Sequence, residues 1–97
     1  MSYDMGIADK SFNYTYNVAD MWYDCYQDKG IREHYGLTGR EATPVLRKLR
    51  EHMEDHSRKL REMEPGTGWG DFDGALKFVN KLVLASSENP SSGRWHD

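Results

Sequence analysis

Two histidines, His52 and His56, stand one helical turn apart in the segment REHMEDHSR and are the residue pair best suited to metal chemistry. Imidazole nitrogens at positions i and i+4 of a helix can chelate zinc, and a neighbouring carboxylate could add a third ligand. Met53 follows His52, so the H-E-x-x-H arrangement of zinc proteases is absent. His56 also falls on the apolar side of the segment, which favours a half-buried packing role. We therefore predict no cofactor and keep the pair as an alternative metal site.

The segment GTGWG, residues 66 to 70, offers a second kind of chemistry. Backbone N–H groups at the start of a helix can hold an anion, and glycines allow a ligand to approach closely. The segment is neither a P-loop nor G-x-G-x-x-G, and Asp71 and Asp73 would repel a phosphate. We interpret it as a turn that caps the following helix, with Trp69 packed at the edge of the core. The alternative, in which Trp69 stacks on a ligand, stays open.

A third candidate site combines polar and aromatic residues near both ends of the chain. A nucleotide site would need arginine side chains to converge with an aromatic ring. We expect the N-terminal strand, the first helix and the closing Arg94-Trp95-His96 to form the contact surface. The candidate ligand-binding residues are Asn13, Tyr14, Tyr16, Asn17, Trp69, Arg94 and Trp95.

The elements that would position these residues follow from periodicity. The segment SFNYTYN over 11–17 alternates aromatic and polar residues, which predicts a strand. Asn17 then suits a helix N-cap, and an apolar stripe predicts a helix to about Tyr26. Residues 1–10 show no periodicity and are predicted to form a flexible tail. The closing segment SSGRWHD predicts a short strand that pairs with residues 11–17.

The middle of the chain predicts two long helical regions. Thr38 and Glu41 have capping-box spacing, whereas Thr43 could instead cap a helix that Pro44 opens; we favour a start near residue 39. The segment EDHS breaks this region in two, and a last helix runs from Asp71 to Asn89-Pro90. The fold class is therefore α+β, with three to four helices packed on a small two-stranded sheet formed by the N- and C-terminal segments. Residues 11–97 make a single small domain.

Composition excludes several functional classes. The formal net charge is -3, so nucleic acid is an unlikely partner. No apolar stretch is long enough to cross a membrane, and the single cysteine, Cys25, is typical of a reducing cytoplasm. Seven of the twelve aromatic residues fall between Tyr3 and Tyr26. A small core cannot easily hide all of them, so we expect some of them at an interface or in a pocket, and we predict a homo-oligomer.

Two stretches resemble a family of small, uncharacterised bacteriophage proteins. They are NYTYNVADM over 13–21 and GWGDFDGALKFVNKL over 68–82, followed by NP and a short C-terminal strand. The family pattern is N-x-T-x-N near the start, then GWG-x-[YF]-x-G and an apolar helix. Members occur notably in actinobacterial phages and in prophages. The resemblance implies a phage-encoded protein that acts in the cytoplasm of an infected bacterium, and it supplies no catalytic residues.

No catalytic arrangement stands out, so we expect a non-enzymatic binding protein. Its target would be a small nucleotide signal of bacterial defence, which the protein sequesters, or a host protein, which it blocks. One alternative is a small hydrolase or metal-dependent enzyme that uses His52 and His56 with neighbouring carboxylates. A structural accessory protein is a further alternative.

Overall fold

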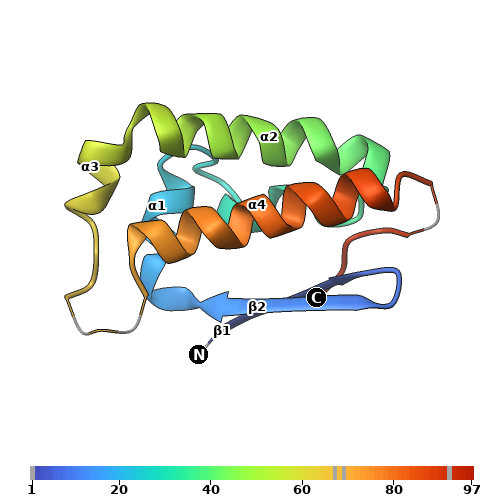
Figure 1. The fold of residues 1–97 in the computed structure, drawn as a ribbon, viewed down its shortest axis with the longest axis horizontal. Helices are drawn as coiled ribbons and strands as arrows, with labels where there is room; N and C mark the ends of the chain where they lie inside the picture. Colours follow the sequence, from blue (N-terminus) through green and yellow to red (C-terminus); the bar gives the residue numbers. More distant parts are fainter. Residues whose placement is uncertain (1, 67, 69, 92) are drawn as a thin grey trace.

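The chain begins with a β-hairpin and continues into helices (Figure 1). The computed structural model describes residues 2–66, 68, 70–91 and 93–97. The elements are β1 (Ser2–Ile7), β2 (Lys10–Thr15), the 3-10 helix η1 (Tyr16–Val18), α1 (Ala19–Tyr23), the 3-10 helix η2 (Gly30–His34), α2 (Gly39–Asp55), α3 (Ser57–Arg61) and α4 (Phe72–Glu88). The helices pack on one two-stranded antiparallel sheet, so the predicted α+β class is confirmed.

The hairpin has one apolar face and one polar face. Tyr3 lies opposite Tyr14, and Met5 lies opposite Phe12. Directly opposite residues share a face of the sheet, so these four side chains face the same way, and they pack in or against the core. The intervening side chains, such as that of Asn13, are exposed.

One detail of the predicted sheet was wrong, because both strands are N-terminal. The segment expected to be a flexible tail supplies β1, and β1 pairs with β2 in place of the expected C-terminal strand. Tyr3, Met5 and Ile7 do alternate with polar or small residues, but the run is short and contains glycine. Among the described residues, the C-terminal segment forms two isolated bridges, one between His96 and Gly6 on β1 and one between Arg94 and Thr38.

The first helical segment begins and ends earlier than predicted. Thr15 is the N-cap of η1, and its side chain accepts a hydrogen bond from the backbone N–H of Asn17 at 3.2 Å. Asn17 was therefore wrongly predicted as the cap. The segment continues as α1 and ends at Tyr23, before the predicted Tyr26.

The middle helices follow the sequence prediction more closely. Thr38 and Glu41 form a capping box at the start of α2, and Pro44 lies inside that helix. The expected break separates α2 from α3 at His56. No side chain caps α3, and His56 is exposed rather than half-buried.

The core lies between a helical layer and the sheet. α2 and α4 run side by side in opposite directions above the hairpin (Figure 1), and they form the most extensive contact between helices. The largest buried side chains include Trp22 of α1 and Trp95 of the C-terminal segment. Within the described residues, no helix has the length and apolar character needed to cross a bilayer.

Candidate functional site

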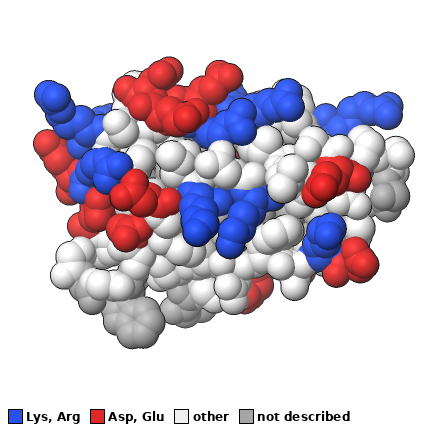
Figure 2. Space-filling model, in the orientation of Figure 1, with Lys and Arg blue, Asp and Glu red and all other residues white. Residues whose placement is uncertain are grey.

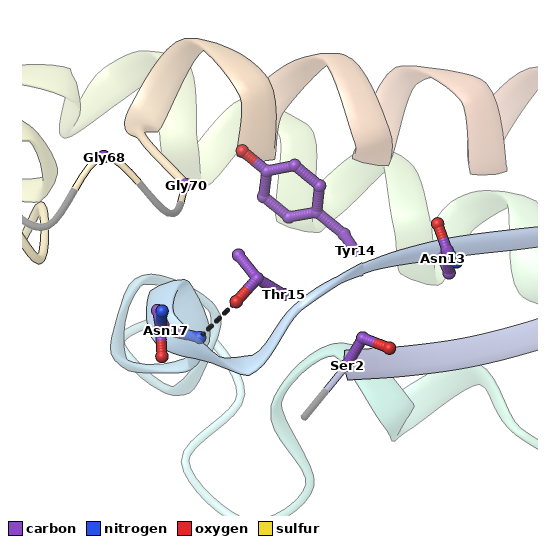
Figure 3. Close-up of a pocket in the computed structure, with 7 residues that line it drawn as sticks. All are labelled: Ser2, Asn13, Tyr14, Thr15, Asn17, Gly68 and Gly70. Atoms are coloured by element: carbon purple, nitrogen blue, oxygen red, sulfur yellow. Dashed lines mark hydrogen bonds between the residues drawn. The ribbon is translucent and has the colours of Figure 1, made fainter.

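A cavity of about 550 Å³ lies where the end of β2 meets the glycine turn that precedes α4 (Figure 3). Its described lining residues are Ser2, Asn13, Tyr14, Thr15, Asn17, Gly68 and Gly70. In the close-up, the Tyr14 ring reaches from β2 toward the first turn of α4, while Ser2 lies on β1 below. Three separate segments therefore line the cavity: β1, the stretch that runs from β2 into η1, and the glycine turn.

The two stretches over 13–21 and 68–82 that stood out in the sequence meet at this cavity. Asn13, Thr15 and Asn17 are the three named positions of N-x-T-x-N, and Gly68 and Gly70 are the two glycines of GWG. They lie more than 50 residues apart in the chain, so only the tertiary fold brings them together. Of the predicted ligand-binding residues, Asn13, Tyr14 and Asn17 line the cavity.

Sequence reasoning missed two residues of the lining, Ser2 and Thr15. Ser2 was assigned to the flexible tail, yet it pairs with Thr15 across the hairpin. The alternation of apolar residues in β1 is the signal that could have placed Ser2. Thr15 was visible as the centre of the N-x-T-x-N pattern.

Tyr14 is the link between the strand and the last helix. Its ring stacks on Phe78 of α4 with 5.6 Å between ring centroids, and it meets Trp22 edge-on at 6.3 Å. Its Oη accepts a hydrogen bond of 3.3 Å from the backbone N–H of Asp71. Because these contacts fix the ring, Tyr14 forms a rigid part of the cavity wall.

The helix cap predicted for Asp71, directly after the glycine turn, is confirmed. Asp71 is the N-cap of α4, and its Oδ1 accepts a hydrogen bond of 2.6 Å from the backbone N–H of Gly74. A carboxylate is favourable there because the N-terminal end of a helix carries partial positive charge. The position that an anion would take at this helix end is therefore filled by the protein's own side chain.

Two glycines allow the strand and the helix to approach closely. Gly70 has φ of +100°, and a Cβ there would lie 2.6 Å from Cγ2 of Thr15. A Cβ at Gly74 would collide with Oη of Tyr14. Both positions therefore require glycine for the observed packing.

Tyr16 does not line the cavity. Its Oη accepts a hydrogen bond of 2.7 Å from the guanidinium of Arg32, which also lies over the rings of Tyr3 and Tyr16 at 4.8 and 5.5 Å. The expected convergence of an arginine with an aromatic ring thus exists. It stabilises the packing of η2 against the hairpin, because both partners are engaged with each other.

The C-terminal candidates, Arg94 and Trp95, lie away from the cavity. Trp95 is 1% exposed, and its Nε1–H donates a hydrogen bond of 2.7 Å to Oγ of Ser86. The guanidinium of Arg94 donates to the carbonyl of Gly36 at 2.9 Å. Trp95 is thus a core residue, and Arg94 ties the C-terminal segment to the loop before α2.

Trp69, the remaining candidate, lies outside the described residues. In the sequence it stands between Gly68 and Gly70, and both of these glycines line the cavity. Whether Trp69 stacks on a ligand stays a prediction.

His52 and His56 stack on each other, with 4.2 Å between ring centroids, and both make internal contacts. Nε2 of His52 lies 2.7 Å from Oδ2 of Asp24, and Nδ1 of His56 lies 2.9 Å from the carbonyl oxygen of His52. Lys59 also contacts Asp24 at 2.7 Å. Hydrogen bonds from Lys59 and His52 lower the pKa of the Asp24 carboxyl. Among the described residues, no group of three or more His, Cys, Asp or Glu could hold a metal ion.

Charged side chains gather mainly over the helices on the face shown in Figure 2. The lower part of that view, where β2 lies in Figure 1, is largely uncharged. The described lining residues of the cavity likewise include no carboxylate, amine, guanidinium, imidazole or thiol. The cavity therefore offers hydroxyl, amide, backbone and aromatic groups to a ligand.

The N-terminal aromatic residues are largely internal, and Tyr14 also lines the cavity. Tyr3 and Trp22 are buried, and Phe12, Tyr14, Tyr16 and Tyr26 pack against the core. Tyr23 is 37% exposed. The observation that motivated self-association is thereby explained by internal packing, and the homo-oligomer stays a prediction.

The structure also reveals a buried histidine that sequence reasoning did not single out. His34 is fully buried between the rings of Tyr35 and Trp95, with centroid distances of 5.3 and 4.8 Å. Within the described part of the chain, neither ring nitrogen has a hydrogen-bond partner. Burial lowers the pKa of His34 to about 4. His34 is therefore neutral at pH 7.

The sequence and the structure were compared with protein families, curated proteins and solved structures. No family model, curated protein or solved structure shows a significant match to this chain.

Proposed function

We propose that the chain is a non-enzymatic binding protein that takes a small nucleotide into the cavity between β2 and the glycine turn. The observation that supports this most is the convergence of Asn13, Thr15 and Asn17 with the glycine turn around one space of about 550 Å³. That volume falls within the range of roughly 300–1,000 Å³ found for small-molecule sites. An aromatic ring beside several hydrogen-bonding groups is also the usual composition of such sites.

Binding fits the cavity better than catalysis. General acid–base chemistry needs a group that exchanges a proton near neutral pH, and covalent chemistry needs an activated nucleophile. The described lining supplies hydroxyls and amides, with no adjacent base to activate a hydroxyl. His52 and His56, the residues of the alternative metal-dependent reading, are held on α2 and at its end by Asp24 and by each other.

The biological setting of the proposal comes from the two family-like stretches. Both contribute to the cavity, and their resemblance to small phage proteins supports an action inside an infected bacterium. A protein that binds without turnover acts by stoichiometric capture. Sequestration of a small nucleotide signal used in bacterial defence is therefore the role we propose.

Native mass spectrometry tests this proposal directly. Protein purified gently from bacteria should carry an added mass of nucleotide size that disappears on denaturation, and the same spectrum reports the oligomeric state. Asn13→Ala removes a lining amide from an exposed position, so it should reduce the retained mass. Asn80→Ala, at an exposed position on α4, is the matched control and should retain it.

Three other results would contradict the proposal. A bare protein in every preparation would favour a protein target or a structural role. An added mass equal to a zinc ion would restore the metal reading. A bound molecule that Asn13→Ala and Asn80→Ala retain equally would place the site elsewhere.

A further inference from the structure

The chemistry of the cavity lining specifies which part of a nucleotide it can recognise. Its side-chain groups are the amides of Asn13 and Asn17, the hydroxyls of Ser2 and Thr15, and the Tyr14 ring with its phenol. An amide offers two donors and an acceptor, and a hydroxyl both donates and accepts. These groups complement neutral partners with mixed donors and acceptors, such as the edge of a nucleobase and the hydroxyls of ribose.

A phosphate group, in contrast, finds no compensating charge in the described lining. Oxyanions are held in proteins by arginine, lysine or free backbone N–H groups at a helix start. The backbone N–H of Gly74 at the start of α4 is already bonded to Asp71 at 2.6 Å. The carboxylate of Asp71 at this position would also repel a second anion.

The arginines of two neighbouring elements are engaged with other residues. Arg61 of α3 pairs with Asp73 at 2.8 Å and lies over the Phe72 ring at 4.6 Å. Arg32 of η2 is held by Tyr16. Neither arginine is among the described residues that line the cavity.

We infer that the cavity recognises the base and ribose of a nucleotide and leaves its phosphate groups outside in solvent. This inference rests on the proposed function, because it specifies how the same site selects its ligand. It replaces the arginine-based nucleotide site expected from the sequence with one built from neutral hydrogen-bonding groups. The selectivity of the site should then depend on the base and on the ribose hydroxyls.

The test compares four nucleosides, adenosine, guanosine, cytidine and uridine, with their 5′-monophosphates by isothermal titration calorimetry. A nucleoside that binds and its monophosphate should have dissociation constants within about threefold of each other, since a phosphate in solvent contributes little free energy. The affinity should also change little between low and high salt, because no ion pair forms. Asn13→Ala should weaken both forms by the same factor, whereas Asn80→Ala should weaken neither.

The outcomes separate the inference from the proposed function. A monophosphate that binds about tenfold or more tightly than its nucleoside, with an affinity that falls as salt rises, would overturn the inference and leave a nucleotide-binding function standing. Absence of binding for all eight probes would overturn both. Thermal unfolding of Asn13→Ala, followed by circular dichroism, shows whether the variant is folded. If it melts like the wild type, its weaker binding is due to the lost contact in the cavity and not to unfolding.

Discussion

The phenol oxygen of Tyr14 and the backbone N–H of Asp71 are joined by a hydrogen bond of 3.3 Å that connects β2 to the start of α4. The same phenol oxygen occupies the space that a side chain at Gly74 would need. The side chain of Tyr14 on β2 therefore contacts both the end of the glycine turn and the first turn of α4. Substitutions of Tyr14 and Gly74 should therefore have non-additive effects on stability, which makes the packing testable.

Gly74→Ala should destabilise the protein, although alanine is intrinsically better than glycine in a helix by about 1 kcal/mol. The new methyl group would collide with the Tyr14 phenol, and this clash outweighs the helical gain. Tyr14→Phe alone should cost about 0.5–1.5 kcal/mol, the usual contribution of one hydrogen bond. In the double variant the clash with the phenol oxygen is relieved, so its loss of stability in urea unfolding should be smaller than the sum of the two single losses. Simple additivity would show that the two residues do not meet as described.

Ser86→Ala should reduce stability by about 1–3 kcal/mol, because it leaves the buried indole N–H of Trp95 without its acceptor. The neighbouring Ser87 is exposed, and its hydroxyl bonds only to the carbonyl of Leu84 within α4. Ser87→Ala is therefore the matched control and should change stability by no more than about 0.5 kcal/mol. Thermal or urea unfolding measures both. Equal effects of the two variants would contradict the assignment of Trp95 to the core.

The double variant His52→Ala with His56→Ala should bind the ligand as the wild type does, because neither residue lines the cavity. Its stability should fall, since Asp24 loses the contact with His52 at 2.7 Å. Zinc chloride and a chelator should leave the melting temperature of the wild-type protein unchanged. A rise in melting temperature with zinc that the double variant lacks would establish a metal site on α2.

Local patterns predicted most of the helical architecture. The capping box of Thr38 and Glu41 and the cap at Asp71 act within one helical turn, so nearby residues suffice to identify them. The exposed position of His56 could not be predicted in this way, because the break after α2 turns it out of the apolar stripe. The strand β1, which pairs with β2, was not predicted, because its alternating pattern is short and lies within a mostly polar N-terminal segment.

The candidate site was predictable only in part. The polar residues of the N-x-T-x-N stretch and the glycine turn each stood out in the sequence, but their meeting depends on the register of β1 with β2 and on the position of α4. Trp95 was assigned to a contact surface because it is the one large apolar residue of a polar segment. Its burial depends on Ser86 and His34, which lie in two other elements.

The buried His34 should make the protein less stable in mild acid. Its pKa is about 4 in the folded protein and 6.5 when unperturbed, so between these values the unfolded chain binds more protons than the native chain. Stability from this residue is therefore complete above about pH 6.5 and declines as the pH falls toward 4, by roughly 3 kcal/mol in total. Urea unfolding at pH 7 and pH 5 measures the part of this loss that occurs above pH 5. His34→Gln removes the titrating group, so the stability of this variant should depend less on pH, whatever its absolute value. A wild-type pH dependence in His34→Gln would show that another group causes the acid sensitivity.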